Sequence, residues 1–488
     1  MKYIKISIVI LLVSFISIFA YKLTTNNSSN KISLTKEQMK EMLSYTIDGN
    51  KTSSMPTKGS GYKVKSITCK SGSILSWDND NWLLEVEKLE SEDLCNIDFT
   101  TGTGSYTVTA VPSISGSLDS TSKTTTENGQ VTFYTKLVID SVSGCTNEIS
   151  DGKIIIKNVT SNTTCNINVS YMKLYDKLLA DKLTRLTRTD FSTVLTKDNT
   201  KTLYTSTENG TTVYYFAGNA TDNWVQFGGY YWRIIRTNSD GGVRLLYHGT
   251  STTATDAYIG TSKFNETYND PMYVGYMYGT SGSQANNRTN QTNSSTIKGV
   301  IDTWYQNNLN TNYGKYISTT AIYCNDRSVT DGTYSVSSSF NYAAYTRLYT
   351  NKTPTYDCTD TNDKFTVDTS TGNGKLTYPI ALMTADEVSF AGGVMYTNAP
   401  TWYYYNSAKG SSTGSTYWWL LSPYIWGGSY ASVFSVFGSS GPGALSNGYV
   451  IGTRGVRPAL SLKSCVKYSS GDGSASTPYT IEETTSGC

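Results

Sequence analysis

The chain has 488 residues, which is more than one hydrophobic core usually organises, so we expect several domains. Charged residues make up only 16% of it, and 40 basic against 38 acidic side chains leave a formal net charge of +2. Because this balance creates no basic surface field, we do not expect nucleic acid as a partner.

The N-terminus has the pattern of an export signal. Two lysines precede an apolar run over residues 6–21. Cleavage after Ala20 would place the bulky Ile18 where a small residue is needed. We therefore interpret residues 1–22 as an uncleaved signal-anchor, a single-pass membrane helix with the bulk of the chain outside the cell. A removed signal peptide, and hence a secreted protein, is the alternative.

Residues 33–49 are predicted to form a short juxtamembrane helix that serves as a stalk. Thr35 and Gln38 have the spacing of a capping box. The apolar residues that follow fall on one helical face: Met39, Met42, Leu43 and Ile47.

The eight cysteines also indicate export, because disulfides persist in oxidising compartments. They form four local couples in sequence, and we predict these as disulfides: Cys69 with Cys95, Cys145 with Cys165, Cys324 with Cys358, and Cys465 with Cys488. The absence of Cys-x-x-Cys spacing and the presence of a single histidine argue against a zinc site.

Residues 62–170 contain an internal repeat. The segments 81–99 and 151–169 align on a shared Cys-Asn-Ile, at Cys95 and Cys165, and both are rich in alternating β-branched residues. We interpret this region as one or two small β-sandwich modules that act as spacers. Trp77 and Trp82 are expected to fill a module core.

The period changes from 2 to 3.6 after residue 170, which predicts a linker helix within residues 171–197. The remainder, 198–488, is predicted to be an α+β domain with a disulfide-closed C-terminal tail. Its clearest element is a β-hairpin over 230–249, around an Asn-Ser-Asp-Gly-Gly turn. Thr384 and Glu387 have capping-box spacing at the start of a short helix.

Several motifs of this region resemble those of a large family of uncharacterised exported bacterial proteins. They are "NWVQFGGYYWRIIRTNSDGGVRLLYHG", "CNDR", "YPIALMTADEVSFAGG", "YWWLLSP" and "GVRPALSLK", and the likeness covers roughly residues 171–466. The C-terminal domain of that family is similar to C-type-lectin-like folds, to formylglycine-generating enzymes and to the variable proteins of diversity-generating retroelements. The resemblance implies a lectin-like fold here, with Gly455-Val456-Arg457 as its closing motif. Because Arg457 follows Gly455 in a strand-like ending and precedes Pro458, we expect a structural role for it, as a buried or half-buried guanidinium held by carbonyls or a carboxylate.

Catalytic and metal-binding patterns are weak. His248, the single histidine, lacks a convergent partner, although Asp240 and Asp256 are near it in sequence. Asp386 and Glu387 are adjacent, and we interpret them as N-terminal residues of a helix rather than as a catalytic carboxylate pair. Calcium bound through Asp326 is an open alternative, but no Asp-x-Asp-x-Asp loop exists and we expect no cofactor.

The aromatic residues of the late loops indicate a binding function. Tyrosine and tryptophan among glycine and serine supply rigid contact area at low entropic cost, although the 39 tyrosines could also reflect compositional bias. We predict four exposed ligand-binding residues: Tyr424, Trp426, Tyr430 and Tyr449. The sequence thus favours a surface-anchored receptor or adhesin that presents a lectin-like head to a carbohydrate or protein ligand. An exported enzyme of the formylglycine-generating type is the alternative.

Overall fold

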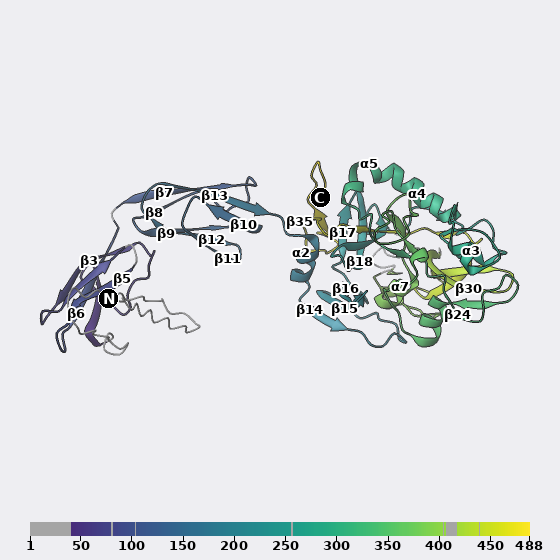
Figure 1. Ribbon diagram of the computed structural model, residues 1–488, viewed down its shortest axis with the longest axis horizontal. Coiled ribbons are helices and arrows are strands. Elements are labelled where there is room, and N and C mark those ends of the chain that lie inside the picture. The colour runs from purple at the N-terminus through teal and green to yellow at the C-terminus, as the bar shows by residue number, and fades with distance from the viewer. Residues whose placement is uncertain are drawn as a thin grey trace, which may run out of the picture. The chain divides into compact units, whose positions relative to one another are not determined.

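Figure 1 shows the computed structural model, which describes residues 41–79, 82–102, 104–254, 257–403, 405–406, 417–438 and 440–488. The protein is mostly β, with 41% strand and 14% helix. It divides into two compact units, one that ends at Ser170 and one that spans Tyr171–Cys488. This boundary coincides with the point where the sequence period changes from 2 to 3.6.

The predicted fold class, a membrane helix and β modules followed by an α+β domain, is wrong. Among the residues that the structure describes, no helix is long and apolar enough to cross a membrane. The predicted signal-anchor, residues 1–22, lies outside the described residues. The C-terminal unit is mostly β because Gly-, Asn- and Tyr-rich stretches that look like loops contain short strands. Those strands find their partners far away in the chain, which local pattern does not reveal.

The N-terminal unit contains two β modules whose four-stranded sheets have a similar arrangement. Module 1 comprises β1 (Leu43–Ile47), β2 (Asn50–Thr52), β3 (Tyr62–Cys69), β4 (Ile74–Asp78), β5 (Leu83–Lys88) and β6 (Cys95–Thr101). Module 2 comprises β7 (Ser105–Pro112), β8 (Ser122–Thr126), β9 (Gly129–Tyr134), β10 (Val138–Ser143), β11 (Asn147–Ser150), β12 (Lys153–Val159) and β13 (Thr163–Ser170). The four-stranded sheets have the orders β2-β1-β6-β3 and β8-β7-β13-β10. In both, the first strand runs parallel to the last one. The region predicted as spacer modules is thus rich in β-strands, and module 1 begins at Leu43 rather than at residue 62.

The predicted juxtamembrane helix does not extend to residue 49: of its described residues only Glu41 and Met42 are helical. Residues 43–47 form β1, which pairs in parallel with β6 from Leu43 opposite Cys95 to Ile47 opposite Phe99. Leu43, Tyr45 and Ile47 alternate along this strand and pack on the module core. Leu43 and Ile47, four residues apart, also fit one face of a helix. The strand forms because β6, about 50 residues away, is available as a partner.

Each module has its own small core. In module 1, Trp77 and Trp82 meet edge to face with ring centroids 5.3 Å apart, and both pack on Phe99. Their predicted role as core residues is confirmed. In module 2, residues from both sheets face each other in one cluster, which includes Val108, Phe133 and Ile167. Module 2 is thus a small β-sandwich.

Two large sheets organise the described part of the C-terminal unit. The ten-stranded sheet contains β14 (Thr184–Thr187), β15 (Thr202–Glu208), β16 (Thr211–Tyr215), β17 (Trp224–Phe227), β18 (Tyr230–Thr237), β19 (Val243–Gly249), β27 (Ile380–Leu382), β34 (Pro458–Leu462), β35 (Tyr468–Ser470) and β36 (Tyr479–Ile481). The seven-stranded sheet contains β20 (Thr261–Ser262), β24 (Val329–Asp331), β25 (Phe340–Tyr342), β30 (Trp418–Trp426), β31 (Ala431–Val436), β32 (Leu445–Tyr449) and β33 (Arg454–Gly455). Three two-stranded pairs complete the strands: β21 (Met277–Tyr278) with β22 (Asn293–Ser294), β23 (Tyr323–Cys324) with β26 (Lys364–Phe365), and β28 (Thr401–Trp402) with β29 (Tyr405–Asn406).

The helices of this unit are short. They are α2 (Leu174–Asp181), α3 (Gln284–Arg288), α4 (Thr296–Asn308), α5 (Asn310–Tyr313), α6 (Ala343–Tyr345), α7 (Ala385–Ala391) and the 3₁₀ or π turns η1 (Pro271–Val274), η2 (Gly314–Tyr316), η3 (Thr346–Asn351) and η4 (Thr361–Asp363). The predicted linker helix is shorter than its segment, since β14 follows α2 directly, and Leu174 and Leu178 bury it in the core of the C-terminal unit. The predicted hairpin is β18–β19. Its two faces are both buried, so Arg233 and Arg244 on the second face are covered as well.

All eight cysteines form disulfides in the predicted couples: Cys69–Cys95, Cys145–Cys165, Cys324–Cys358 and Cys465–Cys488. Each bridge closes a loop of 20 to 34 residues within one module or unit. This pattern is typical of exported proteins.

Candidate binding sites

The four predicted ligand-binding residues divide into two groups. Trp426 is 1% exposed and Tyr424 is 6% exposed, so the prediction that they face solvent is wrong. Both belong to β30, which continues through Pro423 to Trp426 between β31 and β25. Side chains on both faces of β30 are buried along nearly its whole length, so packing covers both faces of the sheet at this strand.

Tyr449 and Tyr430 do reach the surface. The Tyr449 side chain is 51% exposed, Tyr430 is partly exposed, and their ring centroids lie 4.4 Å apart. On β32, Tyr449 and Asn447 are two residues apart and therefore point to the same side of the sheet.

Two further tyrosines extend this surface. Asn447 Nδ2 donates a hydrogen bond of 2.6 Å to the hydroxyl of Tyr396, which is 51% exposed. The Tyr396 ring meets that of Tyr349, which is 44% exposed, at 6.2 Å. We call Tyr349, Tyr396, Tyr449 and Tyr430 the tyrosine row, since contacts or the shared Asn447 link each ring to the next.

Tyr396 has an uncommon backbone conformation and a buried hydrogen-bond partner. Its φ of 53° lies in the left-handed region, which a bulky aromatic residue adopts at a cost in free energy. Its hydroxyl also bonds to that of the buried Tyr424 at 2.9 Å. Burial, together with this bond, raises the pKa of Tyr424, so its hydroxyl stays protonated. Tyr424 thus orients a surface ring from below.

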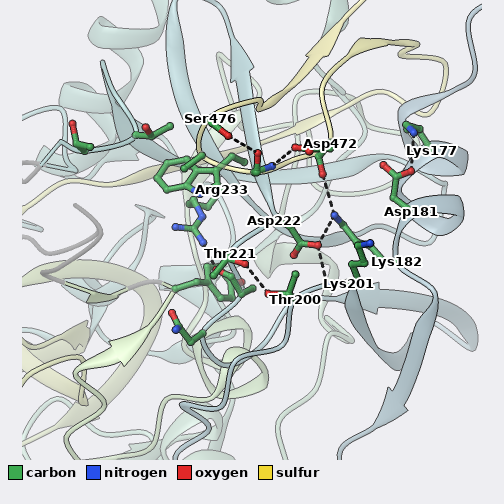
Figure 2. A pocket seen from close by; sticks show the side chains of 18 residues that line it. Lys177, Asp181, Lys182, Thr200, Lys201, Thr221, Asp222, Arg233, Asp472 and Ser476 are labelled. Carbon is green, nitrogen blue, oxygen red and sulfur yellow. Dashed lines mark hydrogen bonds and ion pairs between the residues drawn. The ribbon is translucent and has the colours of Figure 1, made fainter.

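A concave site lies elsewhere in the C-terminal unit. This polar cleft has a volume of about 780 Å³ and lies where α2 ends, beside β17, β18 and the β35–β36 turn. Figure 2 shows the Lys182 ammonium beside the Asp222 carboxylate and near Asp472, with Thr200 and Thr221 on one side and Ser476 on the other. Its lining residues are Lys177, Asp181, Lys182, Thr200, Lys201, Asn219, Ala220, Thr221, Asp222, Trp224, Arg233, Thr252, Thr253, Tyr403, Asp472, Ser474, Ala475 and Ser476.

Asp386 and Glu387 serve structural roles at the start of α7. Thr384 Oγ1 accepts the Glu387 N–H and the Glu387 carboxylate accepts the Thr384 N–H, which confirms the predicted capping box. Glu387 also pairs with two buried arginines, Arg236 at 3.1 Å and Arg244 at 2.6 Å. Asp386 instead faces Arg347 at 2.9 Å. The two carboxylates therefore form ion pairs with different arginines.

This buried network continues through Glu208, which lies 2.8 Å from Arg236. Burial opposes ionisation of Glu208, yet the neighbouring Arg236 guanidinium lowers its pKa below the usual value. The carboxylate of Asp326, the residue considered for calcium, is engaged by Arg347 at 2.7 Å.

His248 and Arg457 are packing residues. The His248 ring is fully buried and meets Trp224 edge to face at 4.4 Å, while Asp256 lies outside the described residues. Arg457 is also fully buried, donates to the Tyr247 carbonyl at 3.3 Å and stacks on Trp418 at 4.7 Å. The predicted structural role, a buried guanidinium held by carbonyls or a carboxylate, is confirmed, with the Tyr247 carbonyl as an acceptor.

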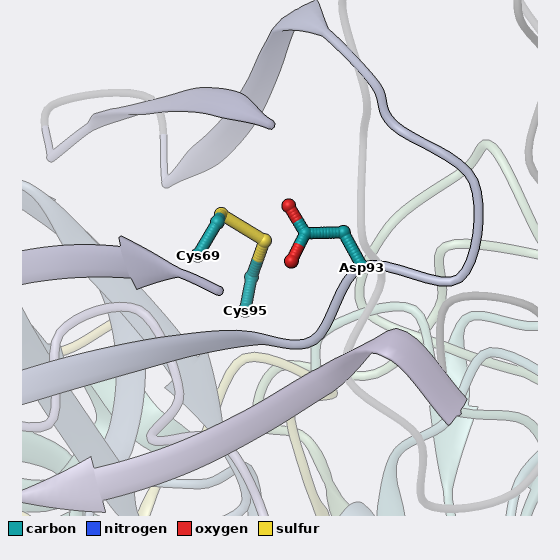
Figure 3. A group of neighbouring side chains, drawn as sticks. All are labelled: Cys69, Asp93 and Cys95. Atoms are coloured by element: carbon teal, nitrogen blue, oxygen red, sulfur yellow. A yellow bond between two sulfur atoms is a disulfide. The ribbon is translucent and has the colours of Figure 1, made fainter. Parts of the chain in front are cut away.

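One cluster of potential metal ligands exists among the described residues, in module 1. Figure 3 shows the Asp93 carboxylate pointing toward the Cys69–Cys95 bridge. The sulfurs are joined to each other, and the carboxylate accepts the N–H groups of Ser71 at 2.6 Å and Ser73 at 2.8 Å. Burial opposes ionisation of Asp93, but these hydrogen bonds prevail and lower its pKa to about 2. Asp93 therefore holds the backbone of the Ser71–Ser73 loop beside the disulfide.

Residues 352–464 match the model of a family described as a domain of unknown function (DUF6273). The match includes Tyr396 and Tyr449 of the tyrosine row and the whole of α7. This match does not confirm the predicted membership of a lectin-like or formylglycine-generating family. No match was found among curated proteins or among solved structures.

Proposed function

We propose that this protein is an exported carbohydrate-binding protein that holds a neutral glycan chain along the tyrosine row of its C-terminal unit. The observation that carries the proposal is the row itself: three tyrosine rings that are 44–51% exposed, linked to a fourth through direct contacts or through Asn447. The two disulfide-pinned modules would act as spacers.

The chemistry of the row fits a sugar chain. An aromatic face carries negative charge density, which attracts the weakly positive C–H groups on the face of a sugar ring. The tyrosine hydroxyls and Asn447 add hydrogen-bonding groups beside the rings. The Lys352 ammonium lies 5.4 Å from the centroid of the Tyr349 ring at one end of the row, while the hydroxyl of Tyr396 bonds to the neutral groups of Asn447 and Tyr424, which suits a neutral chain.

A protein partner fits less well. Stable protein interfaces bury about 800 Å² on each side around an apolar centre. The tyrosine row is a single file of rings without such a centre. The strained Tyr396 backbone and the Tyr424 support indicate preorganised rings, which favour a ligand that stacks on them one unit at a time.

Thiol-dependent chemistry of the formylglycine-generating type receives no support. All eight cysteines are disulfide-bonded, which leaves no thiol in the chain.

The proposal predicts that Tyr349→Ala and Tyr449→Ala each weaken binding to a soluble neutral polysaccharide. An aromatic anchor often contributes about 2 kcal/mol, which corresponds to roughly 30-fold in affinity. Biolayer interferometry against a panel of glucan, mannan and galactan would measure this loss. Tyr134→Ala is the matched control, because Tyr134 is 48% exposed on module 2 and should leave binding unchanged.

Two outcomes would overturn the proposal. One is retention of full affinity by both row variants. The other is a ligand panel in which only acidic glycans or proteins bind the purified chain.

A further inference from the structure

The polar cleft carries its own inference, which does not depend on the tyrosine row. The two sites share no residue. We propose that the cleft binds a single neutral sugar through two neighbouring hydroxyl groups of its ring.

Two ion pairs account for four of the charged side chains that line the cleft, and the Arg233 guanidinium donates to the neutral Asn223 amide oxygen and Ala220 carbonyl. Lys177 pairs with Asp181 at 2.7 Å, and Lys182 pairs with Asp222 at 2.7 Å. The Asp472 carboxylate accepts hydrogen bonds from its own turn, from the Ser474 N–H and the Thr477 hydroxyl. Such a lining favours a polar ligand without net charge.

The Lys182–Asp222 pair offers unused hydrogen-bonding capacity. Both side chains are at least nine-tenths buried, with 1% and 9% exposed. Asp222 Oδ2 accepts from Lys182 Nζ at 2.7 Å and from the Lys201 N–H at 2.8 Å. Oδ1 of the same carboxylate is buried and has no hydrogen-bond partner among the described residues. A buried acceptor without a partner is unfavourable, and its presence beside a cleft points to a ligand donor.

Lys182 supplies the complementary group. Its ammonium has three N–H bonds, of which Asp222 takes one at 2.7 Å and the Asp472 carbonyl takes another at 3.3 Å. The Tyr479 ring lies 5.2 Å from the ammonium, and a ring face is a weaker partner for the third N–H than a hydroxyl oxygen would be. When a sugar ring occupies the cleft, a rotation of the Lys182 and Asp222 side chains toward it lets one hydroxyl donate to Asp222 Oδ1 while its neighbour accepts from the ammonium, since a hydroxyl performs both roles.

The walls provide partners for the other hydroxyls of the sugar. Thr200 and Thr221 form one side, with their hydroxyls 2.8 Å apart, and Ser474 and Ser476 form the other, 3.1 Å apart. In Figure 2, Thr200 and Thr221 lie on one side of the Lys182–Asp222 pair and Ser476 lies on the other. A volume of about 780 Å³ falls within the range of small-molecule sites, which usually span about 300–1,000 Å³.

Isothermal titration of the purified full chain with glucose, galactose, mannose and N-acetylglucosamine tests this site. We expect at least one of them to bind, and its deoxy analogue that lacks one of the paired hydroxyls to bind more weakly. Ser476→Trp places a large ring into the cleft from an exposed turn and should abolish sugar binding without disturbing the core. Thr333→Trp, at an exposed position that does not line the cleft, is the control and should bind as the natural chain does.

The two sites are distinguishable in the same experiment. Tyr449→Ala should retain monosaccharide binding, and Ser476→Trp should retain polysaccharide binding. The inference is overturned if none of the four sugars binds, if Ser476→Trp binds them normally, or if only charged sugars enter the cleft.

Discussion

Trp426→Ala should lower the free energy of unfolding of the C-terminal unit by about 3–5 kcal/mol. The side chain is 1% exposed on β30, where it faces Phe340 of β25 and Ala431 of β31. Truncation removes a large apolar group and leaves a cavity that a closely packed sheet cannot close. Differential scanning calorimetry of the full chain would show a lower melting temperature for this unit, with any separate transition of the N-terminal unit unchanged.

Tyr449→Ala is the comparison for this experiment, because its ring is 51% exposed. It should change stability by no more than about 0.5 kcal/mol. Equal losses in the two variants would contradict the placement of Trp426 in the core and of Tyr449 on the surface.

Glu387→Gln should be similarly damaging, with a loss of about 3–5 kcal/mol, although it changes only one atom of the side chain. The carboxylate is 2% exposed and pairs with Arg236 and Arg244, which are also buried. The amide cannot neutralise two guanidinium groups, so uncompensated charge remains in the core.

Glu266→Gln is the matched control for this substitution. Glu266 pairs with Lys263 on the surface, with 61% and 40% of their side chains exposed, and such pairs contribute about 0–1 kcal/mol. Urea unfolding of both variants would measure the difference. A Glu387→Gln protein as stable as Glu266→Gln would show that the buried network does not hold α7 against the β18–β19 hairpin.

The features predicted well from sequence are those whose partners are close in the chain. The four disulfides join cysteines 20 to 34 residues apart, and the capping box of α7 spans Thr384 to Glu387. The β18–β19 hairpin closes through a turn in which Gly241 has a φ of 80° and Asp240 accepts the Gly242 N–H. In each case local geometry alone determines the contact.

The predictions that were wrong concern residues whose partner strands are distant in the chain. The strand β1 pairs with β6, which lies about 50 residues further along, so a helical pattern was misleading. Tyr424 and Trp426 look like loop residues after Pro423, but β31 and β25 cover β30 to its end. Neighbouring strands, rather than the residues themselves, decide their burial.

The candidate sites show the same division. Tyr430 and Tyr449 could be found from aromatic density, whereas Tyr349 and Tyr396 had no local signal. Tyr349 and Tyr396 are 47 residues apart in the chain, and the contact between their rings exists only in the folded protein. The cleft was missed entirely because Lys182 and the Asp472 carbonyl, which line it together, are separated by 290 residues.

The most direct test of the glycan-binding account is a calorimetric titration of the Ser476→Trp protein, whose polar cleft is blocked, with neutral oligosaccharides of increasing length. The series runs from mono- to hexasaccharide of whichever glycan the polysaccharide panel identifies. The tyrosine row predicts that affinity rises with each added sugar until all four rings are covered and then levels off, and that Tyr449→Ala shortens the rising part. An affinity that is independent of chain length, or a length dependence that Tyr449→Ala leaves unchanged, would contradict binding along the row.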